Sequence, residues 1–279
     1  HIHTKTKMKN LCIGGGVALN GVANYKILSK GPFENVHIPP SPGDAGSAVG
    51  AAQYLYYVYH KNPKNTSSNT QLIQENIYVG PSYSNEEIKS FLDSKNISYE
   101  YFEGISLLQK TAQLIADGNV VGWYQGKMEW GPRALGNRSI LADPRRTDMK
   151  NILNAKIKHR ESFRPFAPSI MEEFTSEYFD IQIPSPYMLM VAPVKKPKEI
   201  PAVTHVDGTG RLQTVSKDSN ELYYNLINEF YKITGVPVII NTSMNVMGEP
   251  IVNTPEEAYY MIVKTDMDCI VMGNYLVRK

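Results

Sequence analysis

The sequence predicts an α/β fold (α+β in detail), in which helices cover a mixed sheet. Short apolar runs typical of buried strands alternate with longer amphipathic segments typical of helices. Clusters of Gly, Pro and Asn separate these segments. Hydrophobic residues make up 42% of the 279 residues and charged residues 20%, which is typical of a globular protein with a sizeable core. At about 150 residues per domain, this length predicts about two domains.

The first 60 residues predict a strand, a glycine turn and two helices. The apolar run at residues 11–13 precedes Gly14, Gly15 and Gly16, and a helix is expected from there to about residue 29. A second helix is predicted over residues 45–60, with Asp44 at its N-cap. Residues 61–74 are polar without apolar periodicity, so we expect a linker there.

Residues 75–279 are expected to form one complete domain of alternating elements. The firmest helix start is Thr254, because Pro255 at the first helical position and Glu257 three residues after the cap form the signature of a capping box. Residues 204–215 are expected to be a loop. The remaining predictions are helices over 85–93, 107–116 and 149–156, and strands over 120–124, 235–240 and 268–271.

The net charge of +2 is too small to indicate a nucleic-acid-binding protein, but the charge is unevenly distributed. Between Lys127 and Arg164 lie ten basic and four acidic residues, a local charge of +6 that leaves −4 for the rest. Such an island attracts the phosphates of a small ligand or a nucleic-acid backbone. A solvated basic helix face is the alternative, and the interleaved glycines and prolines argue against it.

Several classes of protein are excluded or not indicated. No apolar run approaches the ~18 residues of a membrane span, and the start of the chain lacks the apolar core of a signal peptide. Cys12 and Cys269 form no CxxC pair, so neither a zinc site nor a disulfide framework is expected. We therefore expect a cytoplasmic protein. Because the chain opens with His1 and soon enters what looks like the middle of a domain, we expect a fragment.

The densest motif is QGKMEWGPRALGNRSILADPR at residues 125–145. It combines Lys127, Arg133 and Arg138 with three glycines. Glycines allow close backbone approach, and long cations hold phosphate or carboxylate oxygens. The segment HRESFRPFAPSI adds Arg160 and also Arg164, which is fixed before Pro165.

Four further motifs carry polar groups in or beside predicted turns. Ser243 and Asn245 follow a strand that reads as buried, at a sheet edge where α/β folds place ligands. Residues 204–215 carry Arg211, together with His205 and Asp207, where a plain turn is the alternative.

The other two motifs lie in the first 60 residues. The amides of the run GGGVALN, which includes Gly14, Gly15 and Asn20, can approach a phosphate or ribose, although a simple turn explains the glycines equally well. Asp44 suits either a helix cap or a ligand of a metal ion or metal-bound nucleotide.

These motifs, in this order, resemble the O-carbamoyltransferases of the NodU/CmcH family, enzymes of nodulation-factor and antibiotic tailoring. The resemblance runs from about residue 11 to the C-terminus. It rests on GGGVALN, SPGDAGSAVGAA, GKMEWGPRALGNRSILADPR, FRPFAPSI, THVDGTGR and NTSMNVMGEPIVNTPEEA.

The resemblance implies two joined modules. Residues 1–60 would be the C-terminal remnant of an actin/sugar-kinase-like (ASKHA) domain that holds an iron-type divalent metal and transfers the carbamoyl group. Residues 75–279 would be a YrdC-like domain that activates carbamoyl phosphate with ATP and Mg²⁺ to carbamoyl-adenylate. The final acceptor would be a hydroxyl-bearing small molecule.

The resemblance also assigns roles to residues. Lys127 and Arg133, assisted by Arg164, would bind carbamoyl phosphate. Ser243 and Asn245 would contact the nucleotide. Asp44 matches the aspartate that completes the metal site, whose histidine pair lies upstream of this chain, so we expect weak metal binding and incomplete transfer.

Two alternatives stay open. A hydrogenase-maturation carbamoyltransferase has the same chemistry, but there the YrdC-like module precedes the ASKHA module. The second alternative is a YrdC-like module that binds a nucleotide or RNA without turnover. The +6 island suggests it, although nucleic acid is not the expected partner.

Overall fold

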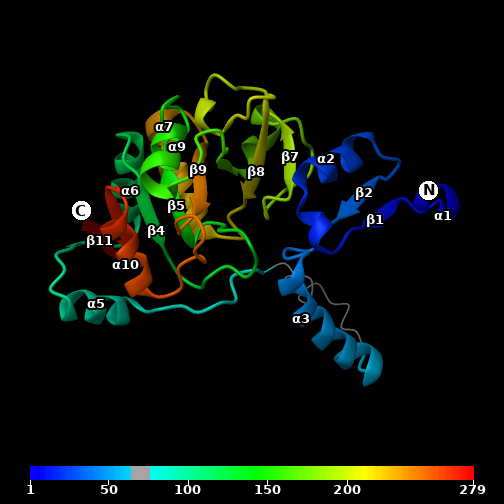
Figure 1. Cartoon of the computed structure of the whole chain (residues 1–279), viewed down its shortest axis with the longest axis horizontal. Coiled ribbons are helices and arrows are strands. Elements are labelled where there is room, and N and C mark those ends of the chain that lie inside the picture. Colours follow the sequence, from blue (N-terminus) through cyan, green and yellow to red (C-terminus); the bar gives the residue numbers. More distant parts are fainter. Residues whose placement is uncertain (64–75) are drawn as a thin grey trace.

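The computed structural model describes residues 1–63 and 76–279 (Figure 1). We call residues 1–63 the N-terminal part and residues 76–279 the α/β domain. The predicted linker at residues 61–74 lies, apart from its first three residues, outside the described residues. The domain boundary placed there stays a prediction.

The α/β domain is built on a mixed sheet, which confirms the predicted fold class. Within residues 76–279 the sheet has nine strands in the order β3-β11-β10-β4-β5-β9-β6-β8-β7. β10 lies parallel to β4 and β6 lies parallel to β8, whereas the other neighbours are antiparallel. The strands are β3 (Glu100–Tyr101), β4 (Val121–Tyr124), β5 (Arg138–Ala142), β6 (Ala167–Met171), β7 (Met190–Pro193), β8 (Thr209–Val215), β9 (Val238–Ser243), β10 (Cys269–Met272) and β11 (Tyr275–Arg278).

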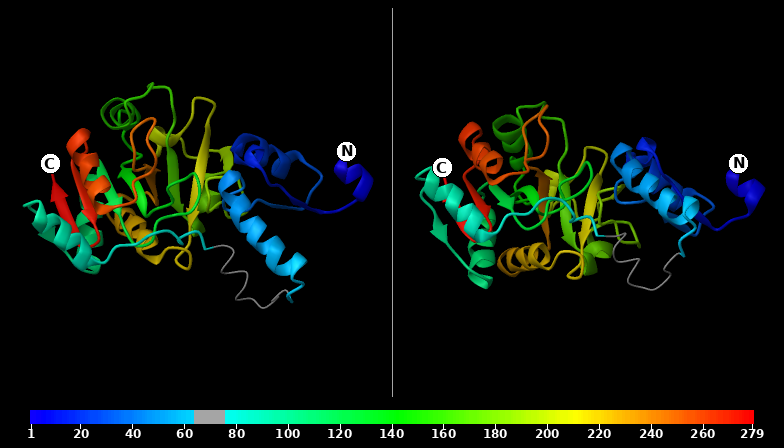
Figure 2. Two further views of the ribbon diagram at one scale, coloured as in Figure 1. Left: turned by 60° about the horizontal axis from the view of Figure 1, so that its bottom comes forward. Right: turned by 90° about the horizontal axis from the view of Figure 1, so that it is seen from below.

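Helices cover both faces of this sheet (Figure 2). Successive strand residues point to opposite faces, so Trp123 packs with α6 and α9 whereas Tyr124 packs in the cluster that includes α5 and α10. The helices are α5 (Asn85–Ser94), α6 (Ile105–Ala116), α7 (Met149–Ile152), α8 (Thr175–Tyr178), α9 (Glu221–Thr234) and α10 (Pro255–Lys264), with short 3-10 turns at η4 (Glu172–Phe174) and η5 (Pro201–Val203). α7 continues as the wider π-helical segment η3 (Leu153–Lys158).

The capping box predicted at the start of α10 is present. The Thr254 hydroxyl accepts the N–H of Glu257, and the Glu257 carboxylate accepts the N–H of Thr254. Both bonds satisfy amides that have no partner within the helix.

The loop predicted over residues 204–215 is wrong for most of its length, because β8 occupies Thr209–Val215. The strand is hidden in the sequence by polar residues. Gln213 and Thr214 are nonetheless buried, and Gln213 bonds to Ser169 and to the Leu135 carbonyl. A buried polar side chain with its hydrogen bonds satisfied is tolerated inside a sheet.

The N-terminal part packs against β7 at one end of the sheet (Figure 1). Its elements are α1 (Ile2–Thr6), β1 (Asn10–Cys12), η1 (Gly16–Leu19), α2 (Gly21–Lys30), β2 (Asn35–His37), α3 (Asp44–Gln53) and the π-helical η2 (Tyr54–Tyr59), with β1 and β2 parallel. Asn24 of α2 is buried and its amide donates to the Leu189 carbonyl at 2.9 Å, just before β7. Tyr25 donates to the Asp180 carbonyl at 2.8 Å.

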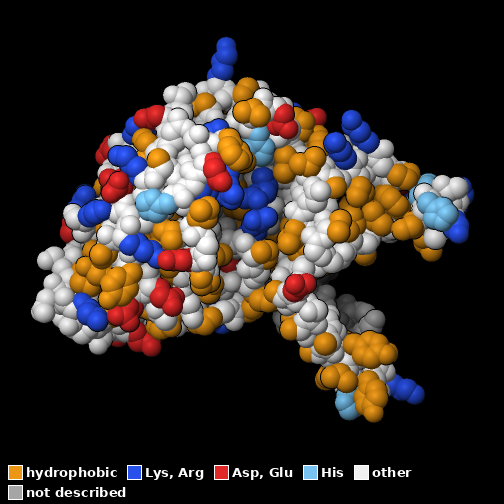
Figure 3. Space-filling model, viewed as in Figure 1, with side chains coloured by type: hydrophobic (Ala, Val, Ile, Leu, Met, Phe, Trp, Pro, Cys, Tyr) orange, Lys and Arg blue, Asp and Glu red, His pale blue; other side chains and the backbone are white. Residues whose placement is uncertain are grey.

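α3 and η2 project from the body of the molecule (Figures 1 and 2). Apolar side chains lie exposed along this projection (Figure 3), among them Tyr54, Leu55 and Tyr59. Asp44 is the first residue of α3 rather than its N-cap, which is Gly43, and the Asp44 side chain makes no capping bond. The N-cap prediction is therefore wrong, because the helix begins one residue earlier than expected. Among the described residues, no helix combines the length and apolar character that crossing a membrane requires.

Candidate functional site: an arginine cluster at one edge of the sheet

The sheet topology gathers segments that are distant in sequence at one edge of the sheet, which is formed by the ends of its strands. β9 ends there at Ser243, which pairs with Ser139 at the start of β5, and Ala167 at the start of β6 pairs with Asn241. β8 runs parallel to β6 and begins beside it. The end of β9 therefore lies at the same edge as the beginnings of β5, β6 and β8.

Three arginines meet at this edge. Arg211 lies in β8, Arg133 in the loop before β5, and Arg160 just after η3. We call Arg133, Arg160 and Arg211 the arginine cluster. Figure 3 shows Lys and Arg side chains gathered near the middle of this face, in the region of β9 and β8.

Within residues 1–63 and 76–279, no member of the arginine cluster forms an ion pair with a carboxylate. Burial, and then the charges of Arg133 and Arg160, lower the pKa of Arg211 to about 9. The Nε atoms of Arg133 and Arg211 are buried and lack a hydrogen-bond partner within residues 1–63 and 76–279. Glu161 lies close enough to Arg160 to raise its pKa, but the Glu161 carboxylate forms its ion pair with Arg164. Cations held together with unsatisfied donors form a binding site for a multiply charged anion.

Arg160 is fixed in place by its neighbours. Its Nε donates to Asn154 Oδ1 at 2.7 Å, and its guanidinium lies 4.8 Å from the ring centre of Phe166. Planar stacking and a side-chain hydrogen bond restrict the guanidinium. Arg160 can therefore present its remaining donors without first losing conformational freedom.

A buried lysine organises the Ser-x-Asn motif. Lys158, 3% exposed, donates to the carbonyl and side-chain oxygens of Asn245 at 2.9 and 2.8 Å and to the Ser243 carbonyl. The Ser243 hydroxyl donates to Asn245 Oδ1 at 2.7 Å. Burial, and then the charge of Arg160, lower the pKa of Lys158 to about 7. Its ammonium group has neutral acceptors in place of a carboxylate.

Lys158 was not singled out from the sequence, and Arg160 was ranked behind Arg164. The available signal was their spacing, because Lys158 ends the helical segment η3 and Arg160 follows it two positions later. Arg164 instead pairs with Glu161 through Nε at 2.9 Å, and both side chains are about half exposed. Burial is the main cause that lowers the pKa of Arg160, and the charge of Arg164 lowers it further.

Lys127 and Arg138 are placed differently from Arg133, although all three come from one motif. The Lys127 side chain is exposed, with no hydrogen bond or ion pair to the part of the chain that the structure describes. Arg138 is fully buried and donates to the Gln125 and Gly126 carbonyls at 2.6 and 3.2 Å. Its guanidinium also stacks on Tyr124. The two terminal nitrogens of Arg138 thus hold the loop from inside, whereas its buried Nε has no partner among the described residues. A ligand contact by Arg138 stays a prediction.

The N-terminal candidates lie at a different place. A cleft of about 1400 Å³ separates the N-terminal part from the α/β domain, and Gly15 and Asp44 line it together with Trp130. Asn20 caps α2 by accepting the Ala23 N–H at 3.1 Å, and Gly14 is exposed. These residues do not join the arginine cluster.

Asp44 has no partners for a metal ion. Over residues 1–63 and 76–279, no three His, Cys, Asp or Glu side chains gather closely enough to hold one. The role of Asp44 as one ligand of a metal whose histidines lie upstream stays a prediction.

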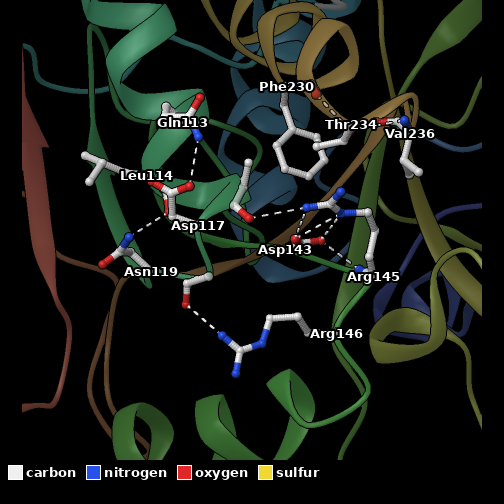
Figure 4. Close-up of polar contacts among 12 residues, drawn as sticks. Gln113, Leu114, Asp117, Asn119, Asp143, Arg145, Arg146, Phe230, Thr234 and Val236 are labelled. Atoms are coloured by element: carbon white, nitrogen blue, oxygen red, sulfur yellow. Dashed lines mark hydrogen bonds and ion pairs between the residues drawn. The ribbon is translucent and has the colours of Figure 1, made fainter.

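Part of the basic island is neutralised within the fold. Arg145 pairs with the buried Asp143 at 2.6 Å, and Arg146 pairs with Asp148 at 2.7 Å. Figure 4 shows Arg145 held between Asp143 and Phe230, close to the end of α6. These two arginines are therefore neutralised within the fold, unlike the three members of the arginine cluster.

Sequence comparison assigns the chain to a family. The sequence model described as Carbamoyltransferase C-terminus matches residues 112–279, and the model described as Carbamoyltransferase N-terminus matches residues 1–53. The chain belongs to the carbamoyltransferase family. The expected resemblance is thereby confirmed.

Relatives of this carbamoyltransferase chain include nodulation proteins. Nodulation protein NolNO of Sinorhizobium fredii is 43% identical over 98% of this chain and 40% of its own length. Nodulation protein NolO of Bradyrhizobium diazoefficiens is 41% identical over 100% of this chain and 51% of its own length. The chain spans about half the length of the curated relatives it matches. P. abyssi Sua5, solved with L-threonine, is similar in structure, with a TM-score of 0.46 and 19% identity over 63% of this chain and 48% of Sua5.

Proposed function

We propose that the α/β domain is the activating, YrdC-like part of an O-carbamoyltransferase, which binds carbamoyl phosphate and ATP and forms carbamoyl-adenylate. The observation that carries this proposal is the arginine cluster, which has no carboxylate partner in the described structure. Two phosphate-bearing substrates supply the negative charge that this site lacks.

The proposed reaction has two steps. Water cleaves carbamoyl phosphate to carbamate and inorganic phosphate. A carbamate oxygen then attacks the α-phosphate of ATP, and pyrophosphate leaves as the carbamoyl-adenylate bond forms. Both steps depend mainly on orientation and on stabilising charge at phosphate oxygens. Arg133, Arg160 and Arg211 supply that stabilisation, with Lys127 and Arg164 at the margin of the site.

The nucleotide would lie against the end of β9. Lys158 and the Glu249 carbonyl fix the Ser243–Asn245 segment, because they hold the Asn245 side chain at both ends. A bound nucleotide would contact the Ser243 hydroxyl or the Asn245 amide in place of part of these internal bonds. Mg²⁺ accompanies ATP and neutralises part of its charge when bound. Transfer to a hydroxyl-bearing acceptor would belong to the ASKHA-type domain, of which residues 1–60 are the proposed remnant, with Asp44 as one ligand of an iron-type metal.

The test is exchange of radiolabelled pyrophosphate into ATP, dependent on added carbamoyl phosphate. We expect exchange by the intact chain and at least a 100-fold loss in Arg211→Met, since each lost charged hydrogen bond at a reacting phosphate costs about 3 kcal/mol. Lys127→Ala tests the more exposed cation in the same way. Arg146→Met is the control, because Arg146 is paired with Asp148 away from the cluster. A folded chain that neither exchanges pyrophosphate nor binds ATP would rule the proposal out.

A further inference from the structure

One buried carboxylate helps to close the loop that carries Arg133. Residues 125–137 join β4 to β5, and we call them the β4–β5 loop. Glu129, in its first half, is 5% exposed. Its Oε1 accepts the backbone N–H groups of Leu135, Asn137 and Arg138 at 2.7, 2.6 and 3.2 Å. A single side-chain oxygen thus ties the first half of the loop to its second half and to the start of β5.

Other groups also tie the two halves of the loop together, because the Asn137 side chain donates to the Lys127 carbonyl at 2.7 Å and Arg138 donates to the Gln125 and Gly126 carbonyls. Neighbouring segments hold the Leu135 carbonyl, because Tyr78 and Gln213 donate to it at 2.8 and 2.9 Å. They do not hold the amides that Glu129 holds. Between Glu129 and Leu135 the chain makes an excursion that places Trp130 at the cleft and Arg133 in the arginine cluster.

We infer that Glu129 is a positioning residue, which sets Arg133 against Arg160 and Arg211 by accepting the three amides of the β4–β5 loop. This inference rests on the proposed anion site. Glu129 contributes through Arg133 and makes no contact with the anion itself.

To hold the three amides, residue 129 needs an acceptor oxygen at the distance that a glutamate side chain spans, and it does not need a negative charge. Burial raises the pKa of Glu129, and its hydrogen bonds to backbone amides oppose that shift. Glutamine keeps the reach and one acceptor oxygen, aspartate is shorter by one carbon–carbon bond of about 1.5 Å, and alanine has no acceptor. The three substitutions therefore separate reach, charge and hydrogen bonding.

Inorganic phosphate is the first probe, with binding measured by titration calorimetry on the full chain. We expect Glu129→Ala and Glu129→Asp to weaken phosphate binding about tenfold, the effect of losing one well-placed charged contact. Glu129→Gln should stay within about threefold of the unsubstituted chain. Glu229→Ala is the matched control, because Glu229 is equally buried at 5% but lies in α9 paired with Lys232. Unchanged phosphate affinity in a folded Glu129→Ala chain overturns the inference.

A double-mutant cycle distinguishes positioning from general loss of stability. If Glu129 acts through Arg133, then Arg133→Met should weaken phosphate binding much less in the Glu129→Ala background than in the unsubstituted chain. Additive losses would contradict the inference, since the two residues would then act independently.

Hydrogen exchange tests the clamp without any ligand. The amides of Leu135, Asn137 and Arg138 should exchange slowly in the unsubstituted chain and faster in Glu129→Ala, with α10 amides unaffected. Fast exchange of all three amides in the unsubstituted chain overturns the clamp. Slow exchange with no phosphate binding by the unsubstituted chain would instead overturn the proposed function.

Discussion

Lys158 lies with its ammonium group surrounded by carbonyl, hydroxyl and amide oxygens at the end of β9. Burial and the neighbouring Arg160 hold its pKa near 7, well below the 10.5 of a free lysine. In the absence of a ligand, a large fraction of Lys158 is therefore neutral above about pH 7. An anion bound nearby favours the charged form.

We predict that phosphate binding takes up protons at pH 8. A bound anion raises the pKa of Lys158, and also that of Arg211 from about 9, so protons bind as the anion binds. Calorimetry at pH 8 in two buffers of different ionisation enthalpy measures this uptake. At pH 6 both groups are already charged, and uptake by them should vanish. Proton release at pH 8 would contradict the prediction.

The same pKa sets the sign of a stability effect. Unfolded Lys158 binds more protons than the folded residue between about pH 7 and 10.5, so its contribution to the free energy of unfolding rises with pH across that window. Below about pH 7 Lys158 is charged in both states, so burying its ammonium group lowers the free energy of unfolding by the full amount.

Some residues that look like ligand-binding residues in the sequence instead hold the elements of the α/β domain together. Arg145, just after β5, lies between the Ala116 carbonyl at the end of α6 and Phe230 of α9 (Figure 4). Its carboxylate partner Asp143 is almost fully buried, whereas the Arg146–Asp148 pair is exposed. Arg145 and Arg146 are adjacent in the sequence, but only Arg145 pairs with a buried carboxylate.

We predict that Arg145→Met lowers the free energy of unfolding by about 3 kcal/mol, because it leaves the buried Asp143 carboxylate unpaired. Arg146→Met should cost less than about 1 kcal/mol, as is usual for an exposed ion pair. Urea unfolding followed by circular dichroism measures both. Equal losses in the two variants would show that the burial of Asp143 does not decide the effect.

Element prediction succeeded where local signals were strong. The capping box at Thr254 and the apolar run at β4 are local features, and both appear in the structure. The sequence does not predict β8 because Gln213 and Thr214 are polar, and only partners in β6 and in two loops, distant in sequence, make their burial tolerable.

At the scale of the whole molecule, folding separates the basic island into structural and unpaired cations. Arg138, Arg145 and Arg146 are occupied by the protein itself. Among the cations that form no ion pair in the described residues, Arg133 and Arg160 of the island and Arg211 of β8 lie close enough together to influence one another. That arrangement suits a compact anionic ligand better than an extended nucleic-acid backbone.

We predict that ATP binding changes less than tenfold between 50 and 200 mM salt. A localised site releases few counter-ions, whereas RNA bound through several phosphates would weaken by about 10³-fold or more over that range. Fluorescence anisotropy with labelled ATP and a labelled single-stranded RNA compares the two directly. Tight, steeply salt-dependent RNA binding without ATP binding would favour the alternative of an RNA-binding module.

The sequence by itself determined the α/β class, the position of most helices and strands, and the segments that carry Arg133, Arg211, Ser243 and Asn245. These features depend on local periodicity, capping and composition, which are readable along the chain. The resemblance to carbamoyltransferases likewise needed only motifs in order.

Tertiary structure alone decided which cations face the site. β9 runs antiparallel to β5 and β6, so its end meets their beginnings. The end of η3 packs there as well, with Lys158 bonded to Ser243 and Arg160 close to Lys158. The same packing buries Arg138 and lets Glu129 close its loop. Side-chain burial and the absence of a counter-charge depend on neighbours far away in sequence, and for that reason no local pattern could specify them.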